Sequence, residues 1–127
     1  VVYLVWRRPY LTVTRDTYIG ALLEEAGATN PFAAWEGRYP EVTPDEIRPA
    51  APAALLLPSE PYRFGERHRL EALRDGLAPL VACVDGEPFC WWGARSAEGL
   101  AYAIEVLAGV RRALAPDSRA ASAQGPA

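Results

Sequence analysis

Three short apolar runs, separated by polar segments, constrain the fold of this chain more than any other feature. The runs are Val1–Trp6, Ala53–Leu57 and Leu80–Val84. The first indicates a strand that is buried on both faces, the second indicates another buried strand, and the third also indicates a strand. Because helical patterns alternate with these strands, we predict an α/β fold, a three-layer α/β/α sandwich with a central, mostly parallel sheet. The length of 127 residues fits one domain.

Helical segments are predicted between and after these strands. Apolar spacing and end signals predict four helices: from Asp16 to Gly27, a short one after Thr43, Glu66–Asp75 with Leu70 and Leu73 inward, and a long one capped by Ser96 that runs to Leu114. The second begins Thr43-Pro44-Asp45-Glu46, a capping-box pattern with proline at the first helical position. Residues 115–127 are rich in Ala, Ser, Pro and Gly and are predicted to be a disordered tail.

Charge and composition exclude several classes of protein. The net charge is −3, and all 13 basic residues are arginine. A general nucleic-acid binder would need a basic face, so we expect no nucleic-acid partner. Apolar runs such as Val1–Trp6 are far shorter than the roughly 20 residues of a transmembrane helix. The chain lacks methionine and opens inside an apolar run, so we expect a piece whose N-terminal part and signal sequence lie upstream.

The residues that enzyme chemistry requires are sparse. The single histidine, His68, lies between two arginines, and we expect it to be solvent-exposed and not a metal ligand. Ser59 lacks the Gly-x-Ser-x-Gly context of a nucleophile, and no glycine-rich phosphate loop is present. Cys83 and Cys90 are spaced for neither zinc nor a thioredoxin motif, which leaves two buried thiols or a disulfide as alternatives. We therefore expect no catalytic residue, no metal site and no cofactor.

Aromatic and charged side chains gather in the segments that follow the predicted strands. Parallel α/β sheets bind ligands at the carboxyl ends of their strands. Aromatic rings with arginine suit a large ligand that has a flat or apolar body and anionic oxygens at its edge. The strand-end candidates for ligand binding are Arg8, Glu60, Tyr62, Trp91, Trp92 and Arg95. Pro88–Trp92 is predicted to be extended, so its two tryptophans would face opposite sides and one could join the core.

Five phrases, in order and with compatible spacing over residues 1–112, resemble one protein family. They are Trp6-Arg7-Arg8-Pro9, Ala26-Gly27-Ala28-Thr29-Asn30, Arg38-Tyr39-Pro40-Glu41-Val42-Thr43, Leu57-Pro58-Ser59-Glu60-Pro61-Tyr62-Arg63-Phe64, and Val84-Asp85-Gly86-Glu87 followed by Trp91-Trp92-Gly93-Ala94-Arg95. The sequence resembles the C-terminal lobe of class III periplasmic binding proteins of ABC importers, the helical-backbone metal receptors for vitamin B12, ferric siderophores and haem. Its cobalamin-receptor branch is the most similar.

The resemblance implies half of a bilobed binding protein. In that family two α/β lobes, joined by one long helix, hold the ligand in the cleft between them. Residues 1–114 would be the C-terminal ligand-binding lobe. The other lobe, the linking helix and a signal or lipoprotein sequence would lie upstream. The resemblance also implies a periplasmic or cell-surface location, and contact with the membrane only through the permease or an upstream lipid anchor.

The family's ligand and partner follow from the same resemblance. The ligand would be a metal chelate: a cobalt corrinoid, haem or a ferric siderophore. The partners would be the permease subunits of the importer. The sequence alone does not choose among the three ligands, because the opposite wall of the cleft is absent from it. A different class of protein, a small free-standing α/β enzyme or regulatory domain with the same fold, is the alternative.

Individual residues of the family's pattern can be matched to this chain. In the family, an aromatic residue before a proline faces the corrin ring, and it corresponds to Tyr39. Trp6, the first residue of the first phrase, is a further candidate for ligand binding. The surface carboxylate that meets arginines of the permease corresponds to Asp45, next to Glu46. The family usually has Glu where this chain has Asp45. The capping box should turn Glu46 back to Thr43 and leave Asp45 facing outward; the alternative is that both only complement the helix dipole.

Overall fold

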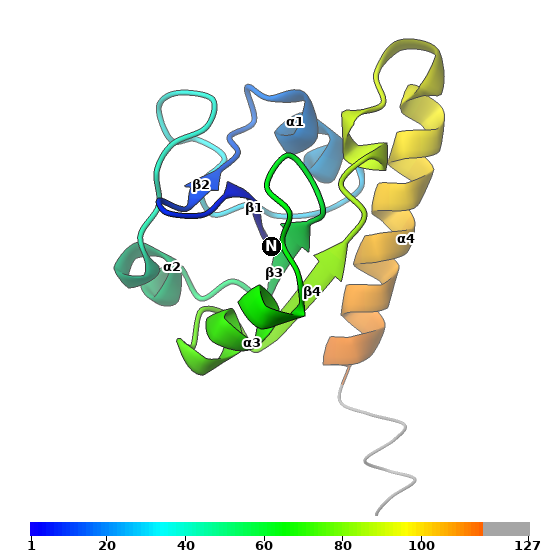
Figure 1. Cartoon of the computed structure of the whole chain (residues 1–127). Coiled ribbons are helices and arrows are strands. Elements are labelled where there is room, and N and C mark those ends of the chain that lie inside the picture. Colours follow the sequence, from blue (N-terminus) through cyan, green and yellow to red (C-terminus); the bar gives the residue numbers. More distant parts are fainter. Residues whose placement is uncertain (116–127) are drawn as a thin grey trace, which may run out of the picture.

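The computed structural model of the chain describes residues 1–115, and the predicted tail lies outside the described residues from position 116 onward. A central sheet lies between two layers of helices (Figure 1). Its strand order is β2-β1-β3-β4. The bounds are Val2–Trp6 for β1, Leu11–Thr12 for β2, Ala54–Pro58 for β3 and Leu80–Val84 for β4. Because β1, β3 and β4 are parallel and only β2 is antiparallel, the predicted three-layer sandwich with a mostly parallel sheet is confirmed.

The four predicted helices are present. They are α1 (Tyr18–Glu25), α2 (Pro44–Ala50), α3 (Glu66–Arg74) and α4 (Ser96–Leu114). Two of them, α2 and α3, begin where predicted. Thr17, and not Asp16, caps α1: its side-chain oxygen accepts a bond from the Gly20 amide. Ser96 is the first residue of α4 and not its cap, since no side chain caps this helix. A short 3₁₀ turn, Gly93–Arg95, directly precedes α4, and Ser96 already has the backbone angles of a right-handed helix.

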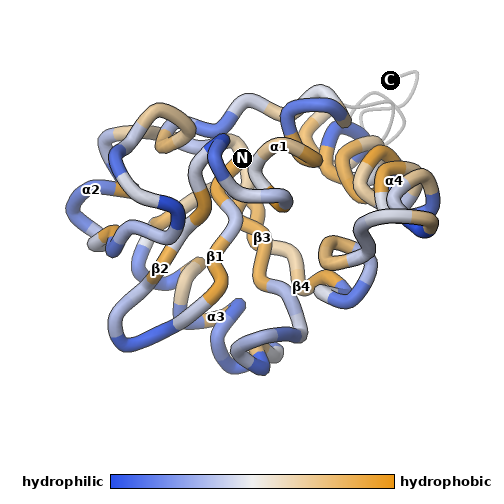
Figure 2. Tube along the Cα trace, turned by 90° about the horizontal axis from the view of Figure 1, so that it is seen from above, coloured by the Kyte–Doolittle hydropathy of each residue, from blue (hydrophilic) through white to orange (hydrophobic). Residues whose placement is uncertain are grey.

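Alternate residues of each central strand point to opposite faces of the sheet and enter different cores. Tyr3 and Val5 of β1 pack into one core with residues of α1 and α4. Val2 and Leu4 pack into the other core, with Ile47 of α2 and residues of α3. Figure 2 shows the resulting hydrophobic centre along β1 and β3. The prediction of buried strands is therefore confirmed for β1 and β3, whereas β4, at the edge of the sheet, is only partly buried and has Cys83 exposed.

Two local predictions are wrong. The segment Pro88–Trp92 is not extended: it forms η1 (Pro88–Cys90), followed by η2 (Gly93–Arg95). The Phe89 side chain is fully buried against Tyr3, and a helical turn allows the chain to reach that position and turn into α4. Leu70 does not point inward but is 53% exposed on α3. Among residues 1–115, no helix has the length and hydropathy needed to cross a bilayer.

Candidate functional site

The carboxyl ends of β1, β3 and β4 lie at one edge of the sheet because the three strands are parallel. The loops that follow β3 and β4 leave the sheet at the top of Figure 1, where the amino-terminal end of α1 also lies. The residues predicted for ligand binding therefore have a common edge from which to act. Within that edge, they fall into separate groups.

A hollow of about 330 Å³ opens at this edge. It is lined by Val5, Trp6, Leu11, Ile19, Tyr39, Glu60, Pro61 and Cys90. We call it the apolar cavity. It brings together three predicted residues that are far apart in sequence: Trp6, Tyr39 and Glu60. The two rings are 42% and 48% exposed, respectively, so they offer apolar surface that a ligand can cover. Glu60 supplies the one carboxylate in this lining.

Glu60 is held in place by a close approach between two loops. A Cβ atom added to Gly86 would lie 2.6 Å from the backbone oxygen of Glu60, so only glycine fits there without movement. The Gly86 amide also donates to the hydroxyl of Ser59 at 3.0 Å. The Asp85-Gly86 dipeptide reads as an ordinary turn in sequence, and nothing local could reveal that its glycine contacts the loop after β3.

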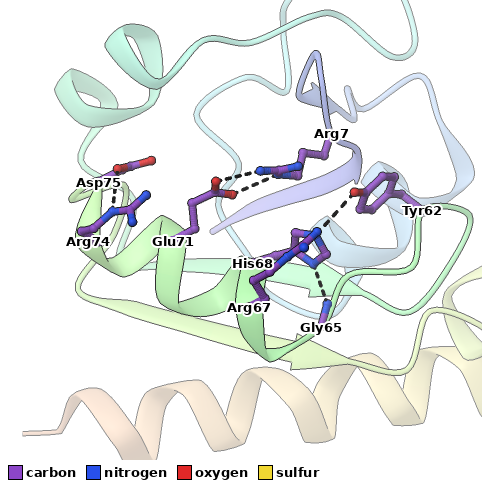
Figure 3. Close-up of polar contacts among 8 residues, drawn as sticks. All are labelled: Arg7, Tyr62, Gly65, Arg67, His68, Glu71, Arg74 and Asp75. Atoms are coloured by element: carbon purple, nitrogen blue, oxygen red, sulfur yellow. Dashed lines mark hydrogen bonds and ion pairs between the residues drawn. The ribbon is translucent and has the colours of Figure 1, made fainter.

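Tyr62 supports the apolar cavity from behind and does not line it. Its ring meets the Trp6 ring edge-on, with centroids 5.3 Å apart. On its other side, the Tyr62 hydroxyl lies 3.4 Å from Nε2 of His68, as Figure 3 shows. Nδ1 of His68 accepts a hydrogen bond from the Gly65 amide at 2.9 Å. Because Nδ1 accepts this bond, the ring proton lies on Nε2 and can be donated to Tyr62.

The prediction that His68 is solvent-exposed is wrong. Its side chain is buried, with 9% of the residue exposed, because it fills the space between the start of α3 and the rings of Tyr62 and Phe64. Burial lowers the pKa of His68, and the positive charges of Arg7 and Arg67 lower it further. This histidine therefore caps the start of α3 and packs against the neighbouring rings. The arginines on either side of it in sequence had suggested an exposed position instead.

Trp91, Trp92 and Arg95 form a second group with Tyr18, which we call the aromatic cluster. The Tyr18 hydroxyl donates to the carbonyl oxygen of Trp91. The Arg95 guanidinium lies 3.6 Å above the Trp91 ring, a cation–π contact. Trp92 is 71% exposed and meets Tyr18 edge-on. Trp91 is partly buried, so neither tryptophan is fully inside the core.

The aromatic cluster adjoins the apolar cavity along the chain. Cys90 lines the cavity and precedes Trp91, while Ile19 lines it and follows Tyr18. Arg8, by contrast, lies outside the cavity lining. It borders two other hollows, one shared with Pro44 at the start of α2 and one along α3.

The start of α2 has the predicted geometry. The Glu46 side chain accepts from the Thr43 amide at 3.0 Å, and the Thr43 hydroxyl accepts from the Glu46 amide at 3.2 Å. The side chain of Asp45 is 93% exposed and pairs with Arg48 at 2.8 Å. The capping box is therefore confirmed, and Asp45 is left facing solvent.

The cysteines match neither alternative left open by the sequence. Cys83 and Cys90 are both free, and both residues are exposed rather than buried. Partial burial raises the pKa of the Cys90 thiol, and the nearby Glu60 carboxylate raises it further. Within residues 1–115, no three His, Cys, Asp or Glu side chains gather as metal ligands would.

Comparisons with known proteins identify the fold. No protein-family model matches the chain, and no curated protein matches it. Among solved structures, the chain is similar to the crystal structure of the periplasmic vitamin B12 binding protein BtuF of Vibrio cholerae. The TM-score is 0.64, with 14% sequence identity over 87% of this chain. The chain corresponds to 44% of the length of that protein. It therefore has the fold of one α/β lobe of a BtuF-like binding protein.

Proposed function

We propose that this chain is the ligand-binding lobe of an extracytoplasmic substrate-binding protein, which delivers a corrinoid or an iron chelate to an ABC importer. The observation that carries the proposal is the apolar cavity, where Trp6, Tyr39 and Glu60 meet at the carboxyl edge of the sheet. The fold likeness to a vitamin B12 binding protein supports it. Binding and release, and not catalysis, is the activity we assign to this site.

The character of the cavity favours a ligand with a broad apolar face. Its lining is mostly aliphatic and aromatic, and the half-exposed rings of Trp6 and Tyr39 stand at its mouth. Stacking on such rings adds roughly 0.5–1.5 kcal/mol beyond simple burial. Glu60 can accept hydrogen bonds from amide or hydroxyl groups at the ligand's edge. A metal ion would then arrive inside its chelate, as part of the cargo, and not through a site built by this lobe.

The apolar cavity is open on one side, which a second lobe could cover. The chain corresponds to less than half of the similar binding protein, and we propose that a second lobe closes over Trp6, Tyr39 and Trp92. On this proposal the protein works in the periplasm or as a cell-surface lipoprotein. Asp45 at the start of α2 would meet a basic group on the permease, because its carboxylate is exposed and not used by the capping box.

Ligand titration tests the site. In the full-length protein, Tyr39→Ala and Trp92→Ala should each weaken cyanocobalamin binding by about 1–3 kcal/mol, because each removes exposed ring surface. Ile104→Ala, which removes a 48% exposed side chain on α4, is the matched control and should bind normally. Isothermal titration calorimetry with cyanocobalamin, haem and a ferric siderophore would identify the ligand. Unchanged affinity in both aromatic variants, for every ligand that binds, would refute the assignment.

A transport assay tests the role of Asp45. Asp45→Arg should leave ligand affinity unchanged but reduce ligand-stimulated ATP hydrolysis by the reconstituted importer, since it places like charges together. Glu46→Ala should instead cost about 0.5–2 kcal/mol of stability by removing the cap, with transport retained by the folded protein. Normal transport by Asp45→Arg would show that this carboxylate serves only the helix start.

A further inference from the structure

A second hollow, of about 580 Å³, lies on the side of the molecule that carries α3. It is lined by Arg7, Arg8, Arg67, Leu70, Glu71 and Arg74. We call it the arginine groove. Four guanidinium groups and one carboxylate give it a formal charge of +3, in a chain whose net charge is −3. This local charge, opposite in sign to that of the whole chain, needs an explanation.

The only carboxylate of the arginine groove is already occupied. Arg7 donates two hydrogen bonds to Glu71, at 3.0 and 2.7 Å, and Figure 3 shows the two side chains facing each other. The Arg7 side chain is 10% exposed, and the pair holds the pKa of Glu71 below its usual value. A bidentate pair of this kind fixes the geometry of both groups. It therefore forms a rigid base for the groove and leaves the remaining arginines without this carboxylate.

The other arginines are available for a partner. Within residues 1–115, neither Arg8 nor Arg67 forms an ion pair, and Arg74 meets only Asp75, at 3.6 Å. Arg8 also has a φ of 60°, in the left-handed region where a non-glycine residue is unfavourable. Backbone strain of this kind is concentrated at binding and active sites.

Leu70 indicates what kind of partner fits. It is 53% exposed and lies among these arginines. A small inorganic anion would make no use of an apolar side chain. Protein interfaces, however, are enriched in arginine and commonly combine it with apolar contacts. The combination therefore favours an acidic segment of a protein.

The arginine groove continues towards α2. An adjoining hollow of about 290 Å³ shares Arg7, Arg8 and Glu71 with it and extends to Thr43 and Pro44. One continuous surface therefore runs from a basic end, at the arginines, to the acidic start of α2. A partner that lies along this surface would need a basic group at one end and acidic groups at the other.

We propose that the arginine groove docks an acidic segment of the importer's permease, beside the basic permease group that meets Asp45. The identity of this partner rests on the proposed function. The acidic chemistry of the partner rests on the groove alone. An experiment can therefore refute the permease as the partner without refuting the acidic chemistry of the partner.

A peptide probe tests the chemistry. Fluorescence anisotropy of a labelled hexaglutamate peptide should report binding to the full-length protein at low ionic strength, and weaker binding as salt screens the charges. Arg67→Glu with Arg74→Glu should weaken binding by about tenfold or more. Arg111→Glu with Arg112→Glu, the same charge change on α4, should leave it within about twofold. Arg67→Gln with Arg74→Gln removes the two charges without reversing them. It should also weaken peptide binding, and it tests the groove if the glutamate variant does not fold.

Three results would overturn the docking surface. Equal loss of peptide binding in the groove and α4 variants would show general charge attraction. Full displacement of the peptide by inorganic phosphate at constant ionic strength would show a small-anion site. Groove-dependent binding to phosphatidylglycerol vesicles without peptide binding would show a membrane surface.

A second experiment tests the partner. In the reconstituted importer, Arg67→Glu with Arg74→Glu should lower stimulated ATP hydrolysis by about tenfold while cyanocobalamin affinity stays unchanged. Normal stimulation would overturn the permease as the partner. Failure of the wild-type protein to bind any chelate would refute the proposed function but leave the peptide result standing.

Discussion

Two regions at the carboxyl edge of the sheet carry the same kinds of side chain but are held very differently. The loop after β3, residues 59–65, is fixed by the Ser59–Gly86 bond at its start and the His68–Gly65 bond at its end. The aromatic cluster of Tyr18, Trp91, Trp92 and Arg95 has contacts between its own members, among them the Tyr18–Trp91 hydrogen bond and the Arg95–Trp91 cation–π contact, and an exposed ion pair from Arg95 to Glu98 of α4. One region is anchored at both ends, and the other presents a 71% exposed tryptophan.

On the proposed function, the difference separates two tasks within one binding surface. An anchored wall keeps its polar group in a fixed position, which reduces the ordering cost of binding. An exposed ring contributes little to the folded lobe alone and gains its contacts only when a ligand or second lobe covers it. We therefore expect substitutions in the β3 loop to affect stability first, and substitutions in the aromatic cluster to affect binding first.

The largest expected contrast is between two glycines: Gly86, which packs against the β3 loop, and Gly93, which follows Trp92 of the aromatic cluster. Gly86→Ala would place a methyl group 2.6 Å from the Glu60 backbone oxygen and should cost about 2–3 kcal/mol of unfolding free energy through forced movement. Gly93→Ala meets no atom within 4 Å but has a φ of +70°, and should cost about 1 kcal/mol. Urea unfolding of both variants measures the contrast. Equal losses would mean that the β3 loop is not anchored as described.

His68→Ala should cost about 1–3 kcal/mol, because it leaves the Gly65 amide and the Tyr62 hydroxyl without their partner. It should also weaken ligand binding, since Tyr62 supports Trp6 from behind. Arg63→Ala, an exposed change within the same loop, serves as the control. Stability is checked by denaturant unfolding. If His68→Ala leaves stability unchanged, His68 does not anchor this end of the loop.

The same residue predicts a pH dependence. The pKa of His68 is lower in the folded protein than in the unfolded chain, so the unfolded state takes up a proton first as the pH falls. Stability should be complete above about pH 6.5, the ordinary histidine value, and should decrease as the pH falls from there towards the lowered pKa. The difference between wild type and His68→Gln across this range isolates the effect. A stability difference in favour of the wild type that grows on acidification would contradict it.

In the aromatic cluster, unlike the β3 loop, a substitution should affect ligand binding more than stability. Trp92→Ala removes an exposed ring with one edge-on contact to Tyr18, and should change stability by about 0.5–1 kcal/mol. Its effect on ligand affinity should be larger than its effect on stability. Thermal unfolding and calorimetric titration of the same samples provide the two numbers. A stability loss that exceeds the affinity loss would place Trp92 in the core of the lobe.

The smallest effect is expected beneath both regions. The Tyr3 hydroxyl is buried and has no hydrogen-bond partner among the described residues. Tyr3→Phe removes this unsatisfied group while keeping the ring against Phe89, and should leave stability unchanged or slightly increased. Differential scanning calorimetry is sensitive enough to detect it. A clear loss would show that a bound water satisfies this hydroxyl.

Local sequence was sufficient for the elements whose signals are local. The apolar runs specified β1, β3 and β4, and in β1 and β3 burial on both faces leaves no polar positions in the strand. The Thr43–Glu46 capping box was also readable, because its two hydrogen bonds join residues three positions apart. From parallel strands the common ligand edge follows by topology alone.

The sequence by itself therefore determined the layers, the direction of the main strands and the edge of the sheet at which their carboxyl ends lie. Only the tertiary structure decided the two-residue strand β2, the helical turns at Pro88–Cys90, the burial of His68, and the separation of Arg8 from the apolar cavity. Tyr39 reaches that cavity because its segment is tied across the sheet edge, with the Thr12 amide donating to the Pro40 carbonyl. Such features depend on contacts between remote segments. The periodicity of a sequence records how each residue prefers to be buried, but not which distant segment will cover it.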